Sequence, residues 1–141
     1  MKKFMGSEYV YIDSSLWKAL VDPNDDFFEK AEKIWGSLKK EDIRLLTSNY
    51  ILDESFTLIR KRCGIEIINI FRDHLVSDWK NVKIIRVTIA DESNAWKWFL
   101  NDWSKLSFTD CTSFAVMKRL SIDRAATFDS HFSKAGFKII N

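Results

Sequence analysis

The sequence predicts an α/β fold: a three-layer α/β/α sandwich in which helices cover both faces of a largely parallel sheet of about five strands. Two observations support this prediction. Short apolar segments rich in β-branched and aromatic residues alternate with longer segments of helical periodicity. Helices also separate successive strands, and strands joined through helices pair in parallel. We expect residues 1–141 to form one domain, because no repeat, low-complexity segment or linker divides them.

Two strands and four helices are expected in the first part of the chain. They are a strand over 8–12, a short helix ending at 20, a helix over 25–40, a strand over 43–46, and helices over 49–62 and 65–79. The first strand is the apolar segment Tyr-Val-Tyr-Ile, and Asp13 with the two serines after it suits a helix cap. An apolar stripe at helical spacing supports the helix over 25–40. The polar residues at 47–49 suit the cap of the next helix, and Gly64 suits its end.

Two helices and three strands are expected in the rest of the chain. They are a strand over 82–87, a helix over 89–103, a helix over 107–120, a strand over 124–128 and a short edge strand over 137–140. Trp96, Phe99, Leu100 and Trp103 follow helical spacing, so we expect this stripe to face the core. Ser107, followed three residues later by an aspartate, resembles a capping box.

Two tryptophans and the two histidines carry expectations of their own. Trp17 and Trp98 fall outside the apolar stripes, and we expect them to contribute to an interface, because exposed aromatic side chains anchor interfaces. His74 lies on an apolar helix face and is expected in the core. His131 is expected to be a hydrogen-bonded structural histidine, with a contact to substrate as the alternative.

Composition argues against a nucleotide-binding phosphate loop, a cysteine-based metal or redox site and a membrane span. Only 4 glycines and 1 proline are present, and no glycine-rich phosphate loop occurs. The 2 cysteines, Cys63 and Cys111, lack metal-binding or redox spacing and are expected to be free thiols in a reducing compartment. No apolar segment follows Lys2 and Lys3, and no stretch approaches the length of a membrane span. We therefore expect a cytoplasmic protein.

Four carboxylates stand where strands end or helices begin. Asp13 and Asp129 follow apolar segments, whereas Glu54 and Asp110 lie in the first turns of expected helices. The carboxyl ends of parallel strands share one edge of a sheet, and ligands bind there. Four acids at that edge require a compensating charge, which a divalent cation supplies, and such a site suits phosphate chemistry. Taken singly, each acid is also explained as a helix cap or a surface residue. Periodicity does not choose between Asp53 and Glu54.

Five ordered segments carry a resemblance to a known family. They are Tyr11–Ser15, Phe27–Ala31, Leu46–Glu54, Leu106–Asp110 and Ala126–Phe132. Together they resemble the PIN-domain family of metal-dependent ribonucleases over about residues 8–140, and they look closest to its VapC-like branch, the toxins of type II toxin–antitoxin pairs. The resemblance selects Glu54 over Asp53. The chain departs from the family at Phe28, where a histidine is common, and at Cys111, where alanine is common.

The resemblance implies a PIN-like nuclease domain with a catalytic metal site. Asp13, Glu54 and Asp110 would hold Mg²⁺ or Mn²⁺, directly or through water. Asp129 would complete the site, on a second and weaker metal or by orienting water. The activity implied is hydrolysis of RNA phosphodiester bonds without a protein nucleophile. It also implies a homodimer and, for the toxin branch, an antitoxin that occludes the acidic pocket.

The sequence leaves alternatives for the roles of two hydroxyls and for the function of the protein. Thr109 and Ser130 adjoin the acids, where they would contact a phosphate or a water, or serve only as helix-start hydroxyls. An aspartate-nucleophile phosphohydrolase would need a second aspartate at the position of Ser15. A receiver-like signalling module fits poorly with Glu54 on a helix. A PIN-fold protein that binds RNA without cleaving it and a housekeeping RNA-processing nuclease are the further alternatives.

Overall fold

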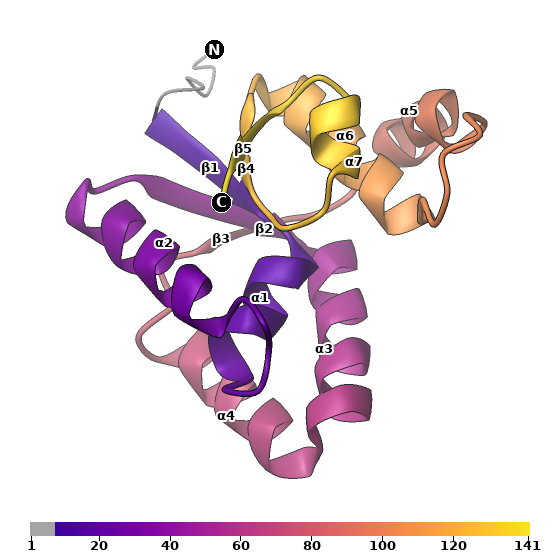
Figure 1. Cartoon of the computed structure of the whole chain (residues 1–141). Helices are drawn as coiled ribbons and strands as arrows, with labels where there is room; N and C mark the ends of the chain where they lie inside the picture. Colours follow the sequence, from indigo (N-terminus) through magenta and orange to yellow (C-terminus); the bar gives the residue numbers. More distant parts are fainter. Residues whose placement is uncertain (1–7) are drawn as a thin grey trace.

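Five parallel strands form the central sheet of the molecule, which is described by a computed structural model over residues 8–141 (Figure 1). The N-terminal pair Lys2 and Lys3 thus lies outside the described residues. The elements are β1 (Tyr9–Ile12), α1 (Ser14–Val21), α2 (Phe28–Lys40), β2 (Arg44–Ser48), α3 (Asn49–Cys63), α4 (Ile65–Val76), β3 (Lys83–Ile85), α5 (Ile89–Phe99), α6 (Phe108–Leu120), β4 (Arg124–Ala126), α7 (His131–Lys134) and β5 (Lys138–Ile140). The expected fold class is confirmed.

The order of the strands creates a switch point beside β1. The sheet runs β3-β2-β1-β4-β5, so the chain moves outward from β1 to β3 and then returns to the other side of β1. Tyr11 of β1 is aligned with Leu46 of β2 on one side and with Ala125 of β4 on the other. The crossovers therefore place helices on both faces, and the strand order reverses between β1 and β4, where ligands bind in sheets of this kind.

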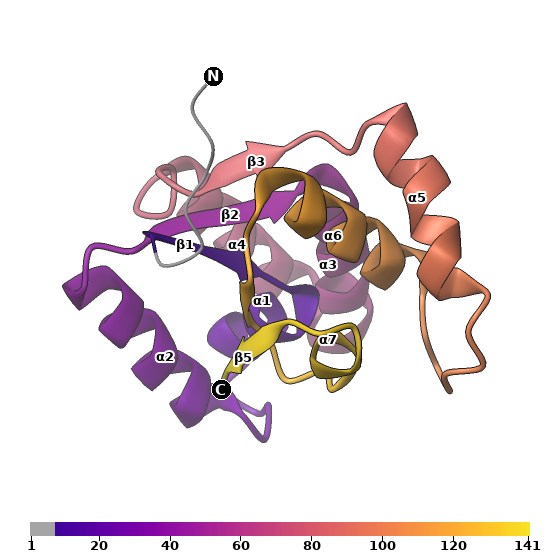
Figure 2. The same cartoon turned by 90° about the horizontal axis from the view of Figure 1, so that it is seen from above.

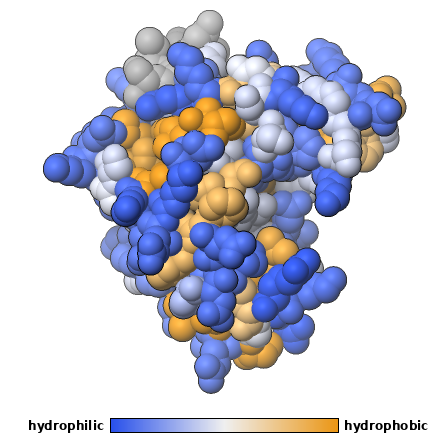
Figure 3. Space-filling view, viewed as in Figure 1, coloured by the Kyte–Doolittle hydropathy of each residue, from blue (hydrophilic) through white to orange (hydrophobic). Residues whose placement is uncertain are grey.

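Helices cover the sheet in two separate layers. Helices α1 to α4 pack against one another on one face, whereas α5, α6 and α7 lie on the other (Figures 1 and 2). Helix α5 packs mainly against α6, so its outer face is left open. The surface in Figure 3 is mostly hydrophilic and is notched between the part that contains α5 and the part that contains α3.

The core sits on both faces of β1, whose four residues are all buried. Trp17 is fully buried and packs against Trp35, Phe71 and Trp79, with ring centroids 5.3–5.7 Å away. The expectation that Trp17 contributes to an interface is therefore wrong. Trp17 lies in an aromatic cluster because α4 and the turn after it bring two further rings onto α1.

The expected core stripe on α5 is only partly buried. Phe99 and Trp103 are half-buried, but Trp96 and Leu100 are 49% and 78% exposed. Helix α5 ends at Phe99, so the stripe does not continue as one helical face. His74 is also not in the core: it is half-exposed, pairs with Asp78 and stacks on Trp79.

Several element ends differ from those expected, and local hydrogen bonds explain them. Helix α2 begins at Phe28 rather than at residue 25, because the Asp25 carboxylate accepts the N–H of Phe27 in a turn. Helix α4 ends at Val76, where the chain turns and buries Trp79. Strand β2 extends through Ser48, and β3 is shorter than expected.

The last strands and helices also differ in extent. Strand β4 ends at Ala126. The N–H of Thr127 still donates to the Ile140 carbonyl of β5, but the next two N–H groups turn to side-chain hydroxyls: that of Phe128 donates to Ser15 Oγ and that of Asp129 to Thr127 Oγ1. The four-residue helix α7 was not expected, since one turn is too short to show helical periodicity.

None of the helices described over residues 8–141 is both long and apolar enough to span a membrane. Both cysteines are free, with Cys111 buried and Cys63 half-buried.

Candidate metal centre

Asp13 lies at the carboxyl end of β1 and is 1% exposed. It occupies the N-cap position of α1, but its side chain makes no capping hydrogen bond. Its Oδ2 instead accepts hydrogen bonds from Thr127 Oγ1 at 2.7 Å and from Ser15 Oγ at 2.9 Å. The two hydroxyls, one on each side of the switch point, hold the carboxylate in place. Helix capping therefore does not explain this aspartate.

Glu54 reaches the same place from the second turn of α3. Its Oε1 accepts a 2.6 Å hydrogen bond from Ser14 Oγ, the residue after Asp13. The side chain is half-buried, whereas its neighbour Asp53 is exposed. The structure therefore directs Glu54, not Asp53, toward Asp13.

Asp110 enters the site from the first turn of α6 and is 5% exposed. It forms the expected capping box with Ser107: the Asp110 N–H donates to Ser107 Oγ at 3.0 Å, and Asp110 Oδ2 accepts the Ser107 N–H at 3.2 Å. Asp110 thus caps a helix and faces the acidic site at once.

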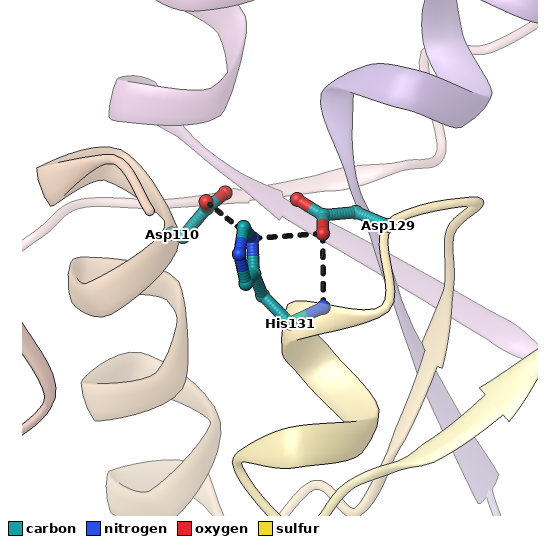
Figure 4. A group of neighbouring side chains, drawn as sticks. All are labelled: Asp110, Asp129 and His131. Atoms are coloured by element: carbon teal, nitrogen blue, oxygen red, sulfur yellow. Dashed lines mark hydrogen bonds and ion pairs between the residues drawn. The ribbon is translucent and has the colours of Figure 1, made fainter. Parts of the chain in front are cut away.

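Asp129 lies in the short segment between β4 and α7. Its Oδ1 accepts the backbone N–H of His131 at 2.9 Å and lies 2.9 Å from Nδ1 of the same histidine (Figure 4). Its own N–H donates to Thr127 Oγ1. Thr127 therefore contacts both Asp13 and the backbone of Asp129.

The convergence of these acids disfavours their ionised forms. Burial raises the pKa of Asp110 to about 7, and the negative charges of Asp13 and Asp129 add to the shift. Burial also raises the pKa of Asp13, against the hydrogen bonds from Thr127 and Ser15. The pKa of Glu54 is raised for the same reason, with repulsion from Asp13 and Asp129 in addition. A positive charge in the site would relieve this cost.

The donor atoms fit a hard divalent cation. Asp13, Glu54 and Asp110 each offer a carboxylate oxygen, and the three oxygens lie within 4.8 Å of one another. Oxygen donors in such a cluster suit Mg²⁺ or Mn²⁺. A second set, Asp110, Asp129 and His131, meets the same distance limit. The acidic cluster can therefore hold a metal ion.

Thr109 and Ser130, the two hydroxyls singled out in the sequence, are not among the hydroxyls that hydrogen-bond to the acids. Thr109 is half-buried in the first turn of α6. Ser130 is exposed at the start of α7, and its side chain does not cap that helix. The hydroxyls that contact the acids belong to Ser14, Ser15 and Thr127. Sequence reasoning did not assign them this role, although each lies within two residues of a candidate acid.

His131 is the other residue whose place the sequence did not reveal. It is 8% exposed and stands between Asp110 and Asp129 (Figure 4). Its Nε2 lies 2.8 Å from the carbonyl oxygen of Ser104, as expected for a hydrogen-bonded structural histidine. Its Nδ1, however, is buried without a hydrogen-bond partner.

A cluster of acids at the switch point of a parallel sheet defines an α/β protein whose carboxylates can hold a metal ion. Comparison with known proteins agrees with that class: the family model described as PIN domain matches residues 10–138. The 23S rRNA-specific endonuclease VapC20 of Mycobacterium tuberculosis is 36% identical over 129 residues, which make up 91% of this chain and 95% of that protein.

Solved structures show the same likeness. The crystal structure of M. tuberculosis VapC20, described as a sarcin–ricin loop cleaving toxin, matches with a TM-score of 0.80 at 34% identity, over 91% of this chain and 95% of that one. VapBC2 of Rickettsia felis, bound to a promoter DNA fragment, gives 0.68 at 11% identity, over 94% and 98%. FitAcB of Neisseria gonorrhoeae gives 0.64 at 16% identity, over 94% and 96%. At these lower identities the likeness concerns the fold alone.

The chain therefore belongs to the PIN-domain family. The resemblance drawn from the five sequence segments is confirmed, and so is its placement near the VapC toxins.

Proposed function

We propose that this protein is a Mg²⁺- or Mn²⁺-dependent endoribonuclease and the toxin of a toxin–antitoxin pair. The observation that carries the proposal is the set of three carboxylates, Asp13, Glu54 and Asp110, with oxygens within 4.8 Å of one another at the switch point of a PIN fold. The relationship to an rRNA endonuclease over nine-tenths of the chain supports the activity.

The side chains of the site have different proposed roles in RNA cleavage. When bound, the cation polarises the phosphodiester and lowers the pKa of a water molecule. Asp13, Glu54 and Asp110 would hold it, while the hydroxyls of Ser14 and Thr127 fix the directions of Glu54 and Asp13. Asp129, which is half-buried, would complete the site, either by orienting the attacking water or on a second metal ion.

The first substrate to test is a hairpin of ribosomal RNA. The relative with 36% identity is named for 23S rRNA, and its structure is described as cleaving the sarcin–ricin loop. We propose the same substrate class here, and hence a cytoplasmic site of action. An RNA hairpin of that sequence should be cut at one position, whereas an unrelated hairpin of equal length should stay intact.

The decisive assay compares wild-type protein with Asp13→Asn and Asp110→Asn in Mn²⁺ and in EDTA. Cleavage should require the metal, and each substitution should abolish it while circular dichroism stays unchanged. Full cleavage in EDTA would contradict the proposal. Wild-type protein that binds the hairpin without cutting it in Mn²⁺ or Mg²⁺ would support the alternative of an RNA-binding protein.

Two exposed apolar surfaces suit the partners of a toxin. Helix α5 exposes Ile89 and Trp96, and Leu100 directly after it is also exposed; the α3–α4 pair exposes Ile65 and Val76 among others. We propose that the α5 surface pairs with a second copy, and that the antitoxin binds the α3–α4 surface and occludes the acidic cluster. Leu100→Glu should convert a dimer into a monomer in light scattering, whereas Val76→Glu should not.

A further inference from the structure

The ring of His131 is held in one orientation beside two carboxylates. Its Nδ1 lies 2.9 Å from Asp129 Oδ1 and 3.6 Å from Asp110 Oδ2 (Figure 4). On the other side of the ring, Nε2 lies 2.8 Å from the Ser104 carbonyl oxygen. The indole of Trp103 is nearly parallel to the imidazole, with 5° between the planes. The ring therefore presents a fixed nitrogen to the acidic site.

The bond to Ser104 determines which ring nitrogen carries a lone pair. A carbonyl oxygen only accepts, so Nε2 carries the proton, and the Nδ1 of the neutral ring has a free lone pair. That nitrogen is buried and has no hydrogen-bond partner. Two carboxylates and a lone pair thus face one small space. A positive charge makes such an arrangement favourable: either a proton on Nδ1, which pairs the ring with Asp129 and Asp110, or a bound cation.

We propose that Asp110, Asp129 and His131 Nδ1 bind a second divalent cation, and that His131 is a direct ligand of it. The inference rests on the proposed metal centre, because Asp110 would be shared between the two positions. The three donor atoms lie within 4.8 Å of one another. A backbone carbonyl on the remote ring nitrogen is the usual support of a ligating histidine, and Ser104 supplies it.

The donor set also selects the ion. Mg²⁺ takes oxygen ligands almost exclusively, whereas imidazole suits first-row transition metals. The position formed by His131 therefore prefers Mn²⁺ to Mg²⁺, and the position formed by Asp13, Glu54 and Asp110, with oxygen donors only, accepts both ions. Mn²⁺ is the probe of choice, because its unpaired electrons report directly on a bound nitrogen.

The experiment is an Mn²⁺ titration of the full chain followed by electron paramagnetic resonance. His131→Gln is the test variant, since a glutamine amide can donate to the Ser104 carbonyl in place of Nε2 but offers no nitrogen lone pair. His74→Gln is the matched control, because His74 is the only other histidine in the sequence and lies on α4. Wild-type protein should bind two Mn²⁺ ions, one of them with a nitrogen coupling in electron spin-echo modulation.

His131→Gln should remove the nitrogen coupling and weaken one of the two positions by about tenfold or more. His74→Gln should change neither. Glu54→Gln should weaken the other position and keep the nitrogen coupling. Two bound ions without a nitrogen coupling, or a single ion unaffected by His131→Gln, would overturn the proposal for His131 and leave the proposed function intact. Absence of any Mn²⁺ binding would overturn both.

Discussion

Ser14 Oγ donates a hydrogen bond of 2.6 Å to Glu54 Oε1 and thereby links the start of α1 to the second turn of α3. Because Ser14 follows Asp13 in the chain, this bond fixes Glu54 beside the aspartate. We predict that Glu54→Gln reduces RNA cleavage by at least about a hundredfold, in the range seen when a preorganised catalytic group is removed. Asp53→Asn, at the exposed neighbour, should stay close to wild type. The opposite ranking of the two variants would mean that the register of α3 is misassigned by one residue.

Metal-free protein should gain stability when one acid of the cluster is neutralised. Asp13→Asn keeps an oxygen for Thr127 but removes a buried negative charge. We predict a rise in melting temperature of roughly 3–6 °C in EDTA, which corresponds to about 1–2 kcal/mol for a domain of this size. Differential scanning calorimetry measures it, and Asp53→Asn serves as the control. No gain from Asp13→Asn would mean that the acids do not repel one another in the folded state.

Stability of the metal-free protein should depend on pH through Asp110. The folded-state pKa of Asp110 is raised from 3.8 to about 7, so the folded protein binds a proton that the unfolded chain has released. The stability from this group is fully present below the unfolded pKa and is lost as the pH rises through the folded value. We predict a fall in the free energy of unfolding between about pH 4 and pH 7, measured by urea titration. Asp110→Asn should flatten that slope.

Added metal should stabilise the folded protein more at neutral pH than at acidic pH, opposite to the pH dependence of the metal-free protein. Binding to the folded state stabilises it by mass action, and ionised carboxylates bind the ion best. Mn²⁺ should therefore raise the melting temperature strongly at pH 7.5 and weakly at pH 4.5. A thermal melt that is indifferent to Mn²⁺ at pH 7.5 would contradict the metal centre itself.

The packing of α5 on α6 should depend on one ion pair. Asp91 is 1% exposed, forms a capping box with Thr88, and accepts hydrogen bonds of 2.9 and 2.8 Å from Arg119 of α6. Burial opposes its ionisation, but the bonds from Arg119 and Thr88 outweigh that effect and hold its pKa below the usual value.

We predict that Asp91→Ala lowers the free energy of unfolding by about 2–3 kcal/mol, through the lost cap and the lost charge-assisted bonds. Urea denaturation measures this, with Asn94→Ala on the same helix as the control. A loss within 0.5 kcal/mol, about that of an ordinary surface substitution, would show that the pair does not hold the two helices together.

The sequence was sufficient to predict the sheet and the acids, for reasons of topology. Asp13 and Asp129 follow strands that are parallel neighbours, and parallel neighbours end at the same edge. Helical periodicity could not predict the orientation of Glu54, because it depends on a contact with Ser14 from another helix. The place of His131 was also hidden: helix α7 is one turn long, and the Ser104 carbonyl that orients the ring lies 27 residues earlier. Burial of Trp17 likewise depended on aromatic partners brought in by α4.

The return of the chain from β3 to β4 divides the active site between its two halves. Asp13 and Glu54 precede the turn after α4, whereas Asp110, Asp129 and the Thr127 hydroxyl that binds Asp13 from 114 residues away follow it. A fragment ending near that turn would carry Asp13 and Glu54, and the complementary fragment would carry Asp110 and Asp129. We expect neither piece alone to cleave RNA, because neither holds all three carboxylates of the proposed metal site. If the two pieces reassemble when each is fused to one of two interacting proteins, RNA cleavage would report that interaction.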